Sequence, residues 1–219
     1  MSSRQRPALA TVAAVLALAA CPMLAGASAT AAPATAPADG ASARAGGLLP
    51  PIGAEIPSSM LAINSELEVK GATYHVDFRG GIKQRVDVNP NDPLYSVRLR
   101  TVGFKVSAEI DSGKYNYVVF EQNDVDVDVR STLTLTQQFP PRYVERDELS
   151  FSAVFEPKDG GEPLVLVTKE PMVLTAALTQ YPARGDLYRL DKPVDLVDPE
   201  HPDNVEAVLK TFPSKRGGL

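Results

Sequence analysis

The stretch SVRLRTVGFKVSAEI, residues 96–110, shows most directly how this chain folds. Before Gly103 the apolar residues Val97 and Leu99 stand at odd positions, whereas the apolar set that begins with Phe104 stands at even positions. Alternation of apolar and polar residues is typical of a β-strand with one buried face. A change of phase at a glycine is what a β-bulge produces. The stretch therefore predicts one long strand that keeps the same face toward a core.

The same alternation continues over residues 59–181, which we take as the folded domain. Turn-forming residues interrupt it in NPNDP (residues 89–93), DSGK (111–114) and KDGGE (158–162). Short strands joined by turns, without helices between them, indicate an antiparallel all-β fold. We expect an antiparallel β-sandwich, with a small β-barrel as the alternative.

Two local expectations follow from the same alternation. RGG at residues 79–81 predicts a turn, because paired glycines often mark one. In residues 60–70, one face is expected to be buried and to carry Leu61, Ile63, Leu67 and Val69.

Residues 182–219 are expected to form a C-terminal extension with one short helix. In PDNVEAVLKTFP, Asp203 could cap a helix over residues 203–212, with Glu206 three residues later. Four apolar residues follow the helical spacing i, i+3, i+4 and i+7, namely Val205, Val208, Leu209 and Phe212.

The stretch QNDVDVDVRSTLTLTQ, residues 122–137, raises the question of a metal site, because it carries Asp124, Asp126 and Asp128. Its apolar residues are all odd-numbered, whereas the three aspartates, Arg130 and the three threonines are all even-numbered, as in a half-buried strand. Carboxylates two apart on a strand lie roughly 7 Å apart at Cβ, whereas calcium requires six to eight oxygens at about 2.3–2.6 Å. The pattern therefore favours a solvent-facing strand, with a weak calcium site as the alternative. No other cofactor is expected.

Residues 1–31 have the features of a secretion signal. Arg4 and Arg6 precede an apolar stretch, and small residues suited to cleavage follow it up to Ala31. LAAC at residues 18–21 is similar to a bacterial lipobox, in which Cys21 would be lipidated. We therefore expect a secreted protein, with a lipid anchor on the outer face of the cytoplasmic membrane as the alternative.

Residues 32–58 are rich in Ala, Pro and Gly and predict a flexible spacer. Together, the Ala-rich leader and this spacer resemble those of exported actinobacterial proteins. The folded part contains no cysteine, which excludes disulfides and thiolate chemistry there. Removal of the leader would change the net charge from −5 to −7, since it takes away two positive charges. An acidic protein is an unfavourable partner for nucleic acid.

No catalytic motif is recognisable: the chain lacks Gly-x-Ser-x-Gly, His-Glu-x-x-His and a P-loop. Tyrosines near strand ends and a His/Asp pair could line a ligand site, although such residues are also common at the edge of a core. The candidate ligand-binding residues are Tyr74, Tyr95, Tyr115, Tyr117, His75 and Asp77.

Two functions fit these observations. The first is an exported, non-catalytic β-sandwich that binds a protein partner or a small ligand at the cell surface or outside the cell. The alternative is a secreted small β-barrel that carries or cyclises a hydrophobic metabolite in a biosynthetic pathway, since such a scaffold needs no sequence motif.

Overall fold

The computed structural model describes residues 47–123 and 130–218. In these residues thirteen strands form one antiparallel sheet, and there is no α-helix. The strands are β1 (Glu55–Val69), β2 (Ala72–Val88), β3 (Ser96–Glu109), β4 (Tyr115–Gln122), β5 (Thr132–Gln138), β6 (Pro141–Leu149), β7 (Phe151–Pro157), β8 (Leu164–Thr168), β9 (Met172–Leu178), β10 (Asp186–Leu190), β11 (Val194–Asp198), β12 (His201–Leu209) and β13 (Ser214–Gly218). The prediction of an all-β antiparallel fold is confirmed.

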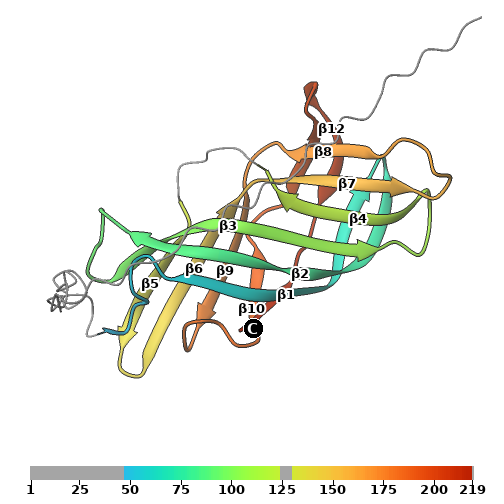
Figure 1. Ribbon diagram of the computed structural model, residues 1–219. Coiled ribbons are helices and arrows are strands. Elements are labelled where there is room, and N and C mark those ends of the chain that lie inside the picture. The colour runs from blue at the N-terminus through green and yellow to red at the C-terminus, as the bar shows by residue number, and fades with distance from the viewer. Residues whose placement is uncertain (1–46, 124–129, 219) are drawn as a thin grey trace, which may run out of the picture. The chain divides into compact units, whose positions relative to one another are not determined.

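The sheet closes on itself twice, and β1, β2 and β3 take part in both closures. Its order is β12-β11-β8-β7-β4-β3-β2-β1-β13-β10-β9-β6-β5, with additional pairings between β12 and β1 and between β3 and β5. We call the circuit completed by β4, β7, β8, β11 and β12 the first lobe. The circuit completed by β5, β6, β9, β10 and β13 is the second lobe (Figure 1). A single sheet that closes in this way combines features of the predicted sandwich and of the predicted barrel.

The first lobe has an apolar interior built around stacked aromatic rings. Phe120 stacks on Phe78 and on Phe151, with 4.5 Å between ring centroids in both pairs. Phe212 lies against Phe78 at 5.5 Å. All four side chains are buried, so this lobe has a dry hydrophobic core.

Bulges adjust the shared strands where they pass from one lobe to the other. The β2–β3 register shifts between Lys83 and Gln84, opposite Gly103, so the phase change expected in residues 96–110 is confirmed. Val97 and Leu99 are buried before it, and Phe104 and Val106 after it. A second shift in β1 lies between Ala62 and Ser65. One strand can thus keep its apolar side inward in both lobes.

Because of the second bulge, the prediction of which residues of β1 are buried is wrong for the part before the bulge. Met60 and Ala62 are buried before the bulge, whereas Ile63 is half exposed and Leu61 is only partly buried. Leu67 and Val69, after the bulge, are buried as expected.

The turn expected at residues 79–81 is also wrong, because β2 runs through it. A Cβ on Gly80 would overlap the carbonyl oxygen of Lys105 and lie 2.7 Å from Cα of Val106. Here glycine permits close approach of β2 and β3 instead of reversing the chain. The turns expected at residues 89–93, 111–114 and 158–162 do separate consecutive strands.

The expected C-terminal helix is wrong as well, since His201–Leu209 forms strand β12. β12 pairs with β11 on one side and with β1 on the other, where Leu67 stands opposite Leu209. Ala207 and Leu209 are buried, whereas Glu206 and Val208 are only partly buried, a two-residue period that the apparent helical spacing concealed. Residues 182–218 contribute four strands to the common sheet, and β1 begins within the expected spacer, at Glu55.

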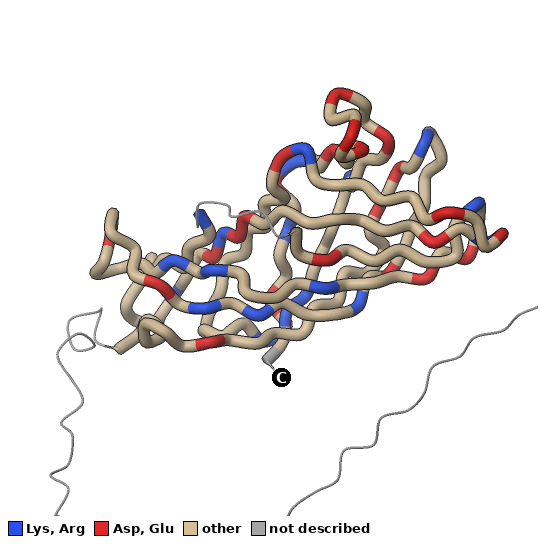
Figure 2. The backbone as a smooth tube through the Cα atoms, turned by 45° about the horizontal axis from the view of Figure 1, so that its top comes forward, with Lys and Arg blue, Asp and Glu red and all other residues tan. Residues whose placement is uncertain are grey.

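Basic and acidic residues lie near one another on neighbouring strands of the outer surface (Figure 2). Arg100 Nε lies 3.0 Å from Asp87 Oδ2, and Lys105 Nζ lies 3.2 Å from Glu121 Oε2. Such exposed pairs contribute little to stability. In the described ranges, no helix has the length and apolar character needed to span a bilayer.

Candidate functional site

The interior of the second lobe holds a cluster of charged side chains. Glu145 and Asp147 project from β6, and Arg216 projects from β13. Their exposed fractions are only 1%, 0% and 1%, respectively. Charged groups this deeply buried are costly unless each is paired. The second lobe therefore differs in kind from the apolar first lobe.

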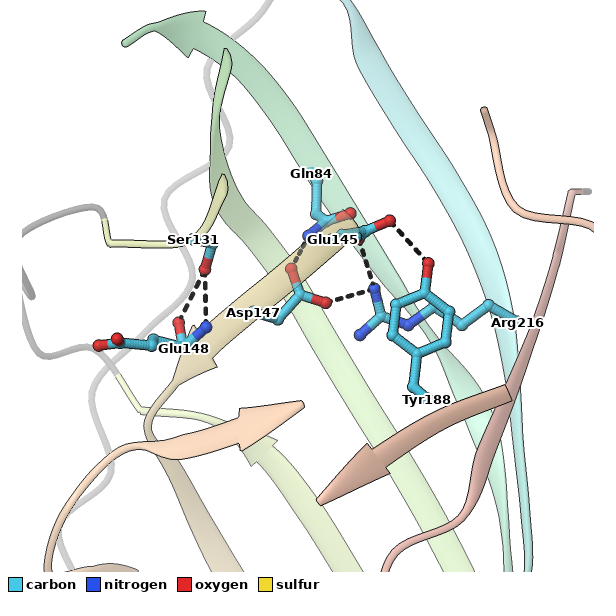
Figure 3. A network of polar contacts seen from close by, with 7 residues as sticks. All are labelled: Gln84, Ser131, Glu145, Asp147, Glu148, Tyr188 and Arg216. Carbon is cyan, nitrogen blue, oxygen red and sulfur yellow. Dashed lines mark hydrogen bonds and ion pairs between the residues drawn. The ribbon is translucent and has the colours of Figure 1, made fainter. Parts of the chain in front are cut away.

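Arg216 links the two acids through one nitrogen (Figure 3). Its Nη1 donates to Glu145 Oε1 at 2.9 Å and lies 2.5 Å from Asp147 Oδ2. Gln84 Nε2 donates to Asp147 Oδ1 at 2.7 Å, and the Tyr188 hydroxyl donates to Glu145 Oε2 at 2.6 Å. The Tyr188 ring also covers the guanidinium, 3.9 Å from its central carbon. These contacts hold the cluster in one arrangement.

The charges of the cluster follow from burial and proximity. Burial, followed by the charge of Asp147, raises the pKa of Glu145 from 4.5 to about 8, against the opposing effects of Arg216 and Tyr188. Burial disfavours the charge of Arg216, but Asp147 and Glu145 outweigh this and raise its pKa. Glu145 therefore holds a proton more readily than an ordinary carboxyl group. With that proton bound, the cluster contains one cation, one carboxylate and one neutral acid.

Several polar atoms of the second lobe have no hydrogen-bond partner. In the described part of the chain, the buried side-chain atoms in this condition are Thr101 Oγ1, Asp147 Oδ2, Tyr181 Oη, Ser214 Oγ, Arg216 Nε and Arg216 Nη2. Asp147 Oδ2 still has its ion pair with Arg216. The other five atoms are hydroxyls or N–H donors.

The unpaired hydroxyls border the charged cluster. Thr101 stands opposite Gln84 in the β2–β3 register, and Ser214 stands opposite Tyr188 in the β10–β13 register. Burial, then the charges of Glu145 and Asp147, raise the pKa of Tyr181. A buried donor without an acceptor costs about 1–3 kcal/mol. The arrangement is therefore suited to a molecule that supplies acceptor oxygens.

A different place, on the outside of the first lobe, brings together three of the residues predicted from sequence. His75, Asp77 and Tyr117 line a half-open polar hollow of about 420 Å³, together with Arg79 and Asp111. Asp77 Oδ1 accepts a hydrogen bond from the backbone N–H of Asn64 at 2.8 Å. The hollow is exposed to solvent and mixes charges of both signs.

The other predicted residues lie apart from this hollow. Tyr74 and Tyr115 are buried in the first lobe, and Tyr95 is exposed in the loop before β3. Asp124, Asp126, Asp128 and Cys21 lie outside the described residues. Among residues that the structure describes, no group of three or more His, Cys, Asp or Glu side chains could hold a metal ion.

The charged cluster was not anticipated from the sequence, although a signal for it exists. In YVERDEL, residues 143–149, Glu145 and Asp147 share the odd positions of Tyr143 and Leu149. All four are buried, so the alternation alone places two acids on the core-facing side of a strand. Arg216 carries no comparable signal, because it lies in a segment expected to be an extension.

Comparison with known proteins supports the fold only. The sequence matches no protein-family model and no curated protein. Among solved structures, the chain is similar to DynF from the dynemicin biosynthesis pathway of Micromonospora chersina, with a TM-score of 0.60 and 18% sequence identity. The match covers 78% of this chain and 83% of that one. This identity is low enough that the similarity shows a shared fold and no more.

Proposed function

We propose that this protein is a non-catalytic binding protein that holds a small, largely apolar molecule inside the second lobe. The observation that carries the proposal is the buried guanidinium of Arg216, whose Nε and Nη2 have no acceptor. The apolar body of a ligand would contact inward-facing residues of neighbouring strands, such as Leu135, Leu174 and Ala176. Ligand sites of this kind combine apolar walls with a few convergent polar groups.

The location that we propose is outside the cytoplasm. The leader at residues 1–31 supports export, and Cys21 supports lipid anchoring as the alternative. A binding protein released from the cell would carry its ligand freely, whereas a lipid-anchored one would keep it at the membrane surface. Sequencing the N-terminus of the protein made by an actinobacterial host distinguishes the two, because lipidation would make Cys21 the blocked first residue.

The experiment that tests binding begins with the protein purified without detergent. Native mass spectrometry should show a discrete added mass that disappears on denaturation. An emptied protein should then bind a small naphthalene compound saturably, with one molecule per chain. Failure of every naphthalene compound to bind, together with the absence of any co-purified molecule, would contradict the proposal.

A second function is favoured by the fold shared with DynF, which comes from a biosynthetic pathway. In that case the protein would carry or cyclise a hydrophobic metabolite. Cyclisation predicts that a bound molecule is released as an isomer of unchanged mass, whereas carriage predicts release of the same compound. Chromatography of the molecule before and after incubation with the protein separates these outcomes.

A further inference from the structure

We infer that the polar group recognised at Arg216 is an uncharged acceptor, such as a ketone, ester or amide carbonyl, and that the site disfavours carboxylates. This inference rests on the proposed function, whose ligand it defines chemically. It depends on which edge of the guanidinium is free and on how many charges already surround it.

The free edge of Arg216 is the one formed by Nε and Nη2. Both contacts to acids use Nη1, with Glu145 Oε1 and Asp147 Oδ2. Nε–H and one N–H of Nη2 point in the same direction, since the guanidinium is planar. One carbonyl oxygen can accept from both, and so can the two oxygens of a carboxylate. Geometry alone therefore admits either group.

Charge separates the two possibilities. Arg216 faces two acids, and both are buried with it. With Glu145 protonated, Asp147 already balances the cation, so a bound carboxylate would leave one uncompensated negative charge. With Glu145 ionised, the cluster is already negative and would repel an anion more strongly. An uncompensated buried charge costs several kcal/mol, whereas a carbonyl adds acceptors without adding charge.

The neighbouring hydroxyls fit the same conclusion. Tyr181 Oη and Ser214 Oγ are buried without partners, and each can donate to an acceptor. The Tyr188 ring covers one face of the guanidinium, and the unpaired N–H groups lie at its edge. The site therefore offers hydrogen-bond donors around a cation that is already neutralised.

Three naphthalenes of similar shape test the inference on the wild-type protein: 2-acetylnaphthalene, 2-naphthoate and 2-ethylnaphthalene. Titration calorimetry or naphthalene fluorescence at pH 7 gives each dissociation constant. We expect the ketone to bind about tenfold more tightly than the hydrocarbon, as for a hydrogen bond to a charged donor. The carboxylate should bind no more tightly than the hydrocarbon. Equal affinity for ketone and hydrocarbon, or preference for the carboxylate, would overturn the inference while leaving the proposed binding function intact. If none of the three binds, the inference is wrong; if no molecule co-purifies with the protein either, the proposed binding function is wrong as well.

Two further measurements locate the effect. The Nε–H signal of Arg216 in a proton–nitrogen NMR spectrum should shift with the ketone and remain unchanged with the hydrocarbon. Ser214→Ala should not lower the stability of the protein, because the buried hydroxyl has no hydrogen bond to lose, yet it should reduce the ketone-to-hydrocarbon preference about fivefold. The matched control is Ser65→Ala, because the buried Ser65 hydroxyl donates to the carbonyl of Ala62. It should reduce stability without changing the preference. If the Nε–H signal does not shift when the ketone is added, the ketone binds elsewhere and the inference is wrong.

Discussion

Replacement of Arg216 by methionine should destabilise the protein strongly, and by an amount that depends on pH. Methionine has a similar length but no charge, so Glu145 and Asp147 would remain buried without their cation. In the native protein the guanidinium lies 2.9 Å from one acid and 2.5 Å from the other, with 1% of its side chain exposed. Removal of one partner from a buried ion pair typically costs about 3–5 kcal/mol. Since domains of this kind are stable by about 5–15 kcal/mol, the variant should lie close to the limit of folding.

The pH dependence of this loss follows from proton binding. Without Arg216, both acids must take up protons when the protein folds at neutral pH. The loss should therefore be largest near pH 8 and shrink toward about pH 3, where the acids are mostly protonated in the unfolded chain as well. The loss of stability can be measured by urea unfolding of both proteins at the two pH values. Tyrosine fluorescence reports the unfolding, because the chain contains no tryptophan.

A matched variant separates loss of charge from loss of packing. Arg216→Met combined with Glu145→Gln and Asp147→Asn removes every charge of the cluster and should recover most of the stability. If Arg216→Met alone costs less than about 1 kcal/mol at both pH values, the cluster is hydrated and our account of its burial is wrong.

Further predictions concern the remaining parts of the fold. Because the pKa of Glu145 is raised in the folded protein, its contribution to stability is fully present below its unfolded pKa of 4.5 and is lost as the pH rises toward about 8. Glu145→Gln should therefore flatten the dependence of urea unfolding on pH over this range. Gly80→Ala should destabilise the protein by at least about 2 kcal/mol, because the added Cβ would overlap the backbone of β3. Gly103→Ala should cost less than about 1 kcal/mol, because its Cβ would lie 3.7 Å from Cβ of Lys83. Similar losses of stability for the two variants in thermal unfolding would contradict this difference. Phe120→Ala should reduce the free energy of unfolding by about 3–5 kcal/mol, because it removes a ring from the core of the first lobe. It should leave the affinity for 2-acetylnaphthalene unchanged. A large change in that affinity would show that the ligand occupies the first lobe.

Residue alternation predicted the strand content well where one face of a strand is apolar. Leu133 and Leu135 are buried and Thr136 is exposed, as the alternation in residues 122–137 predicts for its described part. The same principle failed at β12, because the spacing of Val205, Val208 and Leu209 also fits a helix. A short apolar pattern cannot distinguish the two periods when part of the deciding contacts come from a strand more than a hundred residues away, here β1.

By itself the sequence determined that this is an antiparallel β protein, where three of its turns lie, and that its long third strand changes phase at Gly103. Those properties depend on neighbouring residues, which set the local backbone and the buried face. Only the tertiary structure decided that β1, β2 and β3 serve two closed lobes, and that Arg216 meets Glu145 and Asp147 from 71 and 69 positions away in the chain. The reason is physical: whether a buried charge is paired depends on strand order, which the pattern of a single strand does not contain.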